Sequence, residues 1–210
     1  MKPYLIVKRA ADFIFSLILL VVISPLMLLV ALSIRLESKG PVFFKQKRLG
    51  LNGDTFLIYK FRSMVVNAEK TGTGVYSFKG DSRVTKVGAF IRKTSIDELP
   101  QLFNIIKGEM SVIGPRPTLE YHPWPLEEYT EEQKKRFLVR PGVTGLAQVK
   151  GRKELPWPER IVFDVWYTKK VSLFLDVNIF VKTFIKVIAM GDNYNTGKTA
   201  ENNNIKNSLK

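Results

Sequence analysis

The sequence predicts an α+β protein, with an N-terminal re-entrant membrane helix broken at Ser24-Pro25, followed by a compact, mainly helical cytoplasmic domain with a small β-hairpin. Three observations predict this fold class. Residues 13–34 carry no charged side chain, two short strand-like segments flank a turn, and several helix-length apolar patterns follow them. The 210 residues are 45% hydrophobic, which is enough for one ordinary domain and excludes disorder throughout the chain.

The uncharged segment over residues 13–34 is 22 residues long, the length of a membrane helix. It exceeds the apolar core of a signal peptide, about 7–15 residues, so we do not expect cleavage. Pro25 lacks a backbone donor and divides the segment into arms of about 11 residues, each about 17 Å long and little more than one leaflet deep. Basic residues on both sides favour a cytoplasmic location for both ends, and thus a re-entrant helix. A spanning helix stays an alternative, because Ser24 could satisfy the backbone group that the proline frees.

Residues 42–48 and 55–61 are predicted to form the hairpin, because the link between them contains Asn52-Gly53, a pair suited to a tight turn. Residues 67–83 are rich in glycine, threonine and lysine and are predicted to form a mobile loop. We expect the part of this loop over residues 71–80 to influence the choice of substrate.

Four further helices are predicted from apolar spacing, over residues 99–107, over 127–138, from about Pro158, and over 176–190 with a stop at Gly191. The last one carries an apolar stripe beside two lysines. Packing of that stripe on the core is slightly favoured over contact with anionic headgroups. The predicted units are a membrane-embedded segment over 1–40, a domain over 41–191 and a polar, disordered tail over 192–210.

Composition excludes several kinds of site. The absence of cysteine excludes disulfides, thiolate metal sites and a cysteine nucleophile, and a single histidine, His122, argues against a catalytic triad or a multi-histidine metal site. A metal ion would then be a hard cation held by carboxylates and substrate oxygens. The formal charge of +14 indicates an anionic partner, such as a phosphorylated substrate, lipid headgroups or nucleic acid.

Two adjacent carboxylates, Asp97 and Glu98, are the main candidates for chemistry. One interpretation is a capping box, with Ser95 as the N-cap and Glu98 reaching back to it. That interpretation places Pro100 inside the helix, where its missing amide and its ring are unfavourable. If Pro100 instead occupies the first turn, both acids lie just ahead of the helix, where the positive end of the helix dipole favours carboxylates and phosphates.

Basic residues recur around these acids, several of them on short segments that contain proline and glycine. Each one alone is more often a solvated surface charge than a ligand. Together, arginines on rigid loops form a pattern suited to phosphate oxygens. The candidates are Lys60 and Arg62 in Tyr-Lys-Phe-Arg, then Arg92, Arg116 in Gly-Pro-Arg-Pro, Arg140 before Pro-Gly-Val-Thr-Gly, and Arg152.

Five blocks of the sequence, in this order, resemble the bacterial sugar transferase family of monotopic phosphoglycosyl transferases. They are Ser24-Pro25, residues 59–62, residues 97–104 (Asp-Glu-Leu-Pro-Gln-Leu-Phe-Asn), residues 114–117 and residues 140–149. The resemblance covers about residues 5–190. It implies a re-entrant helix bent at Ser24-Pro25, in a bacterial inner (cytoplasmic) membrane, with the catalytic domain on the cytoplasmic face.

The resemblance also implies an activity. Members of the family transfer a sugar phosphate from a UDP-sugar to undecaprenyl (polyprenol) phosphate at the bilayer surface and release UMP, as the first membrane step of glycoconjugate synthesis. By this likeness, Asp97 is the nucleophile that forms an aspartyl-phosphosugar intermediate, and Glu98 with Asp97 holds Mg²⁺. Lys60, Arg92, Arg116 and Arg152 match positions expected around the phosphates.

Two alternatives remain open from the residues. Direct transfer would leave Asp97 and Glu98 with only metal-binding and acid–base duties. A membrane-tethered basic module would bind anionic lipid or nucleic acid without catalysis. We expect no nucleic-acid partner, because the basic residues lie on loops near paired acids rather than along one helix or among stacking aromatics.

Overall fold

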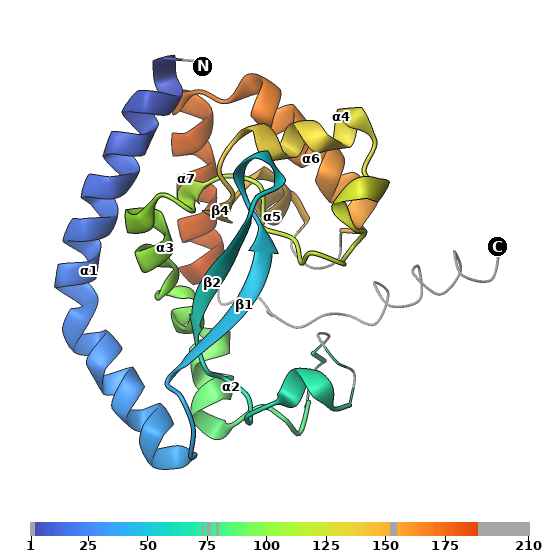
Figure 1. Ribbon diagram of the computed structural model, residues 1–210. Coiled ribbons are helices and arrows are strands. Elements are labelled where there is room, and N and C mark those ends of the chain that lie inside the picture. Colours follow the sequence, from blue (N-terminus) through green and yellow to red (C-terminus); the bar gives the residue numbers. More distant parts are fainter. Residues whose placement is uncertain (1–2, 73, 75–76, 79, 152–154, 189–210) are drawn as a thin grey trace, which may run out of the picture.

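The longest element of the fold is the helix α1 (Pro3–Glu37), which lies along one side of the other elements (Figure 1). A computed structural model describes residues 3–72, 74, 77–78, 80–151 and 155–188. The mixed helix and strand composition and the long apolar N-terminal helix agree with the predicted class. The other elements are β1 (Phe43–Leu49), β2 (Thr55–Phe61), α2 (Lys86–Lys93), α3 (Gln101–Lys107), β3 (Ser111–Ile113), α4 (Glu131–Lys134), β4 (Gly142–Thr144), α5 (Leu146–Gly151), α6 (Trp157–Lys170) and α7 (Leu173–Ile188).

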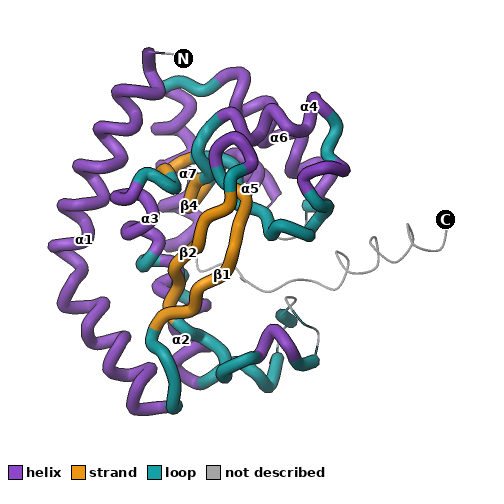
Figure 2. The backbone as a smooth tube through the Cα atoms, in the orientation of Figure 1, coloured by secondary structure: helices purple, strands orange, loops and turns teal. Residues whose placement is uncertain are grey.

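The predicted break at Ser24-Pro25 is not confirmed, because α1 continues through both residues. Proline at position 25 leaves the carbonyl of Val21 without its usual amide partner four residues later. The hydroxyl of Ser24 donates to that carbonyl at 2.8 Å and takes the place of the missing bond. The helix axis bends instead of breaking, as the smooth tube in Figure 2 shows.

The surface of α1 is largely apolar and exposed. The helix is long and apolar enough to cross a membrane, and only 17% of its most apolar window is buried. A buried core helix of a soluble protein would not leave such a surface in water. This exposure supports membrane association of α1. Its most exposed apolar side chains include Ile6, Val7, Ile18, Val21, Val22, Leu28, Leu29 and Leu36.

The predicted hairpin is confirmed, within one residue at its first strand. β1 and β2 pair in antiparallel register from Phe43 opposite Phe61 to Leu49 opposite Thr55. Asn52 and Gly53 take positive φ values of 55° and 85°, the backbone that favours these two residue types in tight turns. One face of the hairpin packs on α3, and Phe61 packs on the C-terminal half of α1.

Polar groups fasten the C-terminal end of α1 to the hairpin and to α2. The buried guanidinium of Arg62, which follows β2, donates to the carbonyls of Ser38 and Lys39 at 2.7 and 2.6 Å. The carboxylate of Glu37 accepts bonds from the backbone amides of Lys86 and Val87, at the start of α2. Each contact satisfies backbone groups that a helix end leaves unpaired.

The N-terminal end of α1 is fastened by buried polar contacts to α3, α6 and α7. Arg9 donates to the carbonyls of Ile105 and Ile106 at the C-terminal end of α3. Asp176 of α7 accepts hydrogen bonds from Tyr4 and Tyr167 and pairs with Lys8 at 2.8 Å. Both ends of α1 are therefore tied to the rest of the chain.

Several elements differ from those predicted. The parallel pair of β3 and β4, and the helices α2 and α5, were not anticipated. Residues 127–138 do not form one surface helix: α4 is only four residues long, and Arg136 after it is buried against Asp164. The helix predicted from Pro158 is α6, and α7 begins at Leu173, three residues before its predicted start. Gly191 and the predicted tail lie outside the described residues.

The described part of the predicted loop over 67–83 is held by the buried Arg83. Its guanidinium donates to the carbonyls of Ala68, Thr71 and Gly74, at 2.7 to 2.8 Å, and pairs with Asp81. One side chain thus links three carbonyls of this segment.

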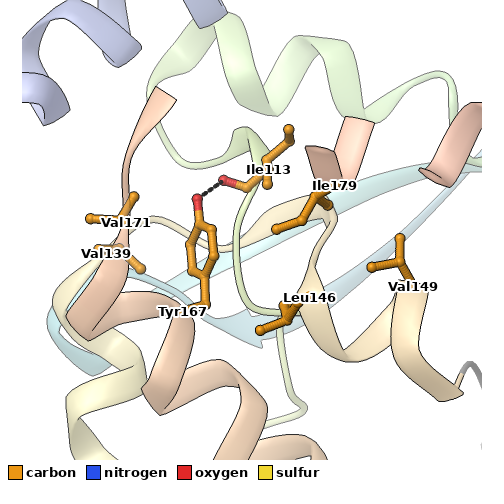
Figure 3. Close-up of a cluster of buried hydrophobic side chains, with 7 residues drawn as sticks. All are labelled: Ile113, Val139, Leu146, Val149, Tyr167, Val171 and Ile179. Atoms are coloured by element: carbon orange, nitrogen blue, oxygen red, sulfur yellow. Dashed lines mark hydrogen bonds between the residues drawn. The ribbon is translucent and has the colours of Figure 1, made fainter. Parts of the chain in front are cut away.

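Tyr167 lies among the buried side chains of one hydrophobic cluster, with its hydroxyl directed at Ile113, as Figure 3 shows. Its hydroxyl donates to Asp176 and lies 3.2 Å from the carbonyl of Ile113.

We expect Tyr167→Phe to lower the free energy of unfolding by about 1–3 kcal/mol, because a buried carboxylate loses a donor. Thermal unfolding in detergent measures this loss, with Tyr121→Phe, at an exposed tyrosine, as the control. Equal stability of the two variants would contradict the prediction.

Candidate active site

Asp97 and Glu98 lie in a short 3-10 turn, Ile96–Glu98, between α2 and α3. The capping-box interpretation is wrong, because Ser95 has a left-handed backbone with φ of 60° and its side chain makes no capping bond. Pro100 directly precedes α3, as the alternative predicted. The turn ends where a helix begins, so both carboxylates lie ahead of α3.

Glu98 is the better neutralised of the two acids. Lys60 Nζ lies 2.6 Å from Glu98 Oε1, and Arg116 Nη2 lies 3.3 Å from the same oxygen. Burial alone would raise the pKa of Glu98, but the charges and hydrogen bonds of Lys60 and Arg116 outweigh it and lower that pKa below its usual range. Glu98 is therefore a fixed negative charge at neutral pH.

Asp97 has the opposite character. Burial raises its pKa above the usual range for aspartate, and the charge of Glu98 adds to this, while Lys60, Arg92 and Arg116 oppose it. A raised pKa makes a carboxylate more basic. Two neighbouring carboxylates with pKa values moved in opposite directions are typical of a pair with different chemical roles.

The acids line a cleft of about 1020 Å³. Its walls include the inner face of the hairpin, the turn between α2 and α3, and parts of α5, α6 and α7. The structure brings Lys60, Arg92 and Arg116 into this cleft beside Asp97 and Glu98. Their roles stay predictions, and Arg152 lies outside the described residues.

Two of the candidate arginines have structural contacts. Arg62 lines the cleft but donates to the carbonyls of Ser38 and Lys39, just after α1, and Arg140 Nε donates to the carbonyl of Gly108 at 2.7 Å. Short motifs rich in proline and glycine therefore do not by themselves separate ligands of phosphate from caps of helix ends.

Sequence reasoning missed two other arginines of the cleft, Arg48 and Arg160. Arg48 lies on β1 and shares the inner face of the hairpin with Gln46, to which it donates a 2.6 Å hydrogen bond. The two-residue period of a strand could have found Arg48, since it lies at the same parity as Phe44 and Gln46. Arg160 lies over the ring of Trp157 on the first turn of α6.

The acid pair supplies only part of the ligand set that a hard divalent cation needs. Among the described residues, no group of three or more His, Asp or Glu side chains is close enough to hold an ion alone. Mg²⁺ is commonly held by one or two carboxylates and completed by substrate phosphates, and Asp97 and Glu98 fit that smaller donor set. The positively charged side chains of the cleft suit an anionic substrate. Asp97 would lie beside that substrate.

Comparisons with known proteins agree with this chemistry. The chain is 40% identical over 196 residues to a UDP-glucose:undecaprenyl-phosphate glucose-1-phosphate transferase of Xanthomonas campestris pv. campestris, covering 91% of this chain and 40% of that protein. It is 44% identical to a UDP-N-acetylgalactosamine-undecaprenyl-phosphate N-acetylgalactosaminephosphotransferase of Aeromonas hydrophila, covering 90% of this chain and 45% of that protein. An uncharacterized sugar transferase, EpsL of Bacillus subtilis (strain 168), is 43% identical, with 88% of both chains covered.

The chain thus spans less than half the length of the first and the second of these relatives. The family model described as bacterial sugar transferase matches residues 3–190, which include α1, the hairpin, the acid turn and α7. The chain belongs to the bacterial sugar transferase family.

Proposed function

We propose that this protein transfers a sugar phosphate from a UDP-sugar to undecaprenyl phosphate and releases UMP. The observation that carries the proposal is the acid pair beside Lys60, Arg92 and Arg116, in a cleft whose lining reaches the exposed apolar helix α1. The names of the Xanthomonas and Aeromonas relatives, which act on UDP-sugars and undecaprenyl phosphate, support the choice of substrates.

In the proposed reaction, a carboxylate oxygen of Asp97 attacks the β-phosphorus of the donor. A bond between that oxygen and phosphorus forms as the bond from phosphorus to the bridging oxygen breaks, and UMP leaves with the electron pair. A phosphate oxygen of undecaprenyl phosphate then attacks the same phosphorus, which forms the diphosphate product and restores Asp97. A covalent step of this kind replaces one difficult displacement between two anions by two easier ones.

The cations of the cleft reduce the repulsion in both steps. Lys60, Arg92 and Arg116 surround the acids and offset charge on the phosphate oxygens. Lys60 and Arg116 also hold Glu98 in one place. Asp97 and Glu98 would hold Mg²⁺, which when bound would supply further positive charge to the diphosphate.

The proposed site lies at the cytoplasmic face of a bacterial inner membrane. Support comes from two apolar surfaces: that of α1, and a stripe on α7. The sequence slightly favours packing of the apolar stripe of this helix on the core. Ile179 of that stripe is buried, whereas Phe180 and Phe184 are exposed. Phe15 of α1 and Phe180 lie edge to face, with ring centroids 6.1 Å apart, so the two surfaces are adjacent.

The first prediction concerns Asp97. With Mg²⁺, undecaprenyl phosphate and a panel of UDP-sugars, we expect the protein to release UMP, and Asp97→Asn to release none because it lacks the nucleophile. With donor alone, mass spectrometry should find a phosphosugar on Asp97 of the wild type. UMP release that needs the acceptor, with no adduct, would indicate direct transfer. Release of UDP would overturn the assignment.

The second prediction concerns Lys60. We expect Lys60→Met to lower the turnover number by about 10²- to 10³-fold, because the cleft loses a fixed cation and Glu98 loses its closest partner. Lys60→Arg should recover part of the activity. The control is Lys86→Met at the exposed start of α2, and equal rates for Lys60→Met and this control would contradict the prediction.

The third prediction concerns the topology of α1. We propose that it is re-entrant, bent at Ser24-Pro25, with both ends on the cytoplasmic side. The chain contains no cysteine, so single cysteines at Lys2 and Lys39 report on each end alone. In intact cells, an impermeant thiol reagent should label neither, and after lysis it should label both. Labelling of one end in intact cells would indicate a spanning helix.

A further inference from the structure

Two half-buried arginines of the cleft, Arg48 and Arg160, lack a carboxylate in direct contact among the described residues. Within the part of the chain that the structure describes, neither forms an ion pair with a carboxylate. Arg48 donates to the carbonyl of Pro117 and to Gln46, but its Nε is buried and lacks a hydrogen-bond partner among the described residues. Arg160 donates from Nε to the carbonyl of Leu155. Partial burial of a cation carries a desolvation cost that a bound anion would offset.

The two arginines form one group with Arg116. Burial and, next to it, the positive charge of Arg116 together lower the pKa of Arg48 to about 10. The same two causes lower the pKa of Arg160 to about 10. Arg116 also contacts Glu98, so it connects the acid pair to this group. Like charges that repel one another in one cleft favour a ligand with more than one negative charge.

Two aromatic side chains lie beside these guanidiniums. Trp157 has Arg160 over its ring at 4.9 Å from the centroid, and His122 meets it edge to face at 5.5 Å. Burial lowers the pKa of His122, and the charges of both Arg48 and Arg160 lower it further, so His122 is neutral and lies near both. This end of the cleft combines cations with flat, uncharged surfaces, which suits a nucleotide.

We propose that Arg48 and Arg160 bind the α-phosphate of the nucleoside diphosphate, and that Trp157 and His122 border its nucleoside. This inference rests on the proposed function, in which the β-phosphorus lies against Asp97. The α-phosphate is joined to the β-phosphorus through one oxygen, so it must lie next to the acid pair. Arg116 contacts Glu98, and Arg48 donates to the carbonyl of Pro117, the residue after Arg116; Arg160 lines the same cleft, and this group marks the direction in which the nucleotide extends.

The proposal assigns a task to each group of cations. Lys60, Arg92 and Arg116 surround the phosphate that is transferred, whereas Arg48 and Arg160 stabilise the phosphate that leaves. When the bridging bond breaks, the leaving oxygen gains negative charge on UMP, and two guanidiniums there act on charge that develops during the reaction. UMP is therefore expected to bind this group in the absence of the sugar.

The test measures UMP binding by calorimetry on the full chain in detergent. We expect Arg48→Gln and Arg160→Gln each to raise the Kd of UMP by about 10- to 100-fold, the effect of losing a hydrogen bond to a charged group. They should raise the KM for the UDP-sugar and leave the KM for undecaprenyl phosphate unchanged. Lys47→Gln is the matched control, because Lys47 precedes Arg48 on β1, points to the opposite face and is 67% exposed.

Other outcomes separate this inference from the proposed function. An unchanged Kd for UMP in both variants overturns the inference. If, in addition, the KM for undecaprenyl phosphate rises, the two arginines are assigned to the acceptor instead. Arg48→Lys and Arg160→Lys retain the charge and replace the glutamine variants where those do not fold. A wild type that binds UMP but turns over no donor would refute the proposed function, while the comparison of Kd values would still decide the role of the arginines.

Discussion

The fold depends on how the ends of its helices are capped by charged side chains from distant parts of the chain. Helix ends expose amides and carbonyls that need partners. Here Arg62 binds the carbonyl of Ile34 in the last turn of α1 and those of the two residues after α1, Arg9 binds the last carbonyls of α3, and Glu37 binds the first amides of α2. Two of these three caps are supplied by α1 itself. The membrane-associated helix is thus part of the frame that orients α2 and α3, and not an appendage to a separate domain.

The same frame determines the chemistry of the acid turn. Asp97 and Glu98 are neighbours in sequence, yet one lies between two cations while burial dominates the other. Lys60 reaches the turn from β2, and Arg116 reaches it from the loop after β3. The opposite directions of the two pKa shifts therefore come from tertiary contacts, and each depends on where the hairpin and the loop after β3 lie.

Local chemistry explains which features could be predicted from the sequence. Asn52-Gly53 determines the hairpin, and Pro100 places both acids ahead of α3, because these residues act on their own backbone. The three-residue strands β3 and β4 show no periodicity, and they pair across about thirty residues of chain. Arg62 and Arg116 both line the cleft, yet Arg62 donates to a carbonyl beside the end of α1 whereas Arg116 pairs with Glu98. The tertiary contacts of these two arginines, and not their neighbours in sequence, distinguish their roles.

Ser24 and Arg62 together have a consequence for where the reaction takes place. The hydroxyl of Ser24 donates to the carbonyl of Val21, so this carbonyl keeps a hydrogen-bond partner where α1 bends. Arg62 joins the end of the bent helix to the strand that carries Lys60. Lys60 and Glu98 are thereby held at a constant height relative to the apolar surface of α1. For the proposed reaction, bilayer thickness then becomes a variable, because a lipid that changes the depth of α1 also moves Asp97 toward or away from the headgroups.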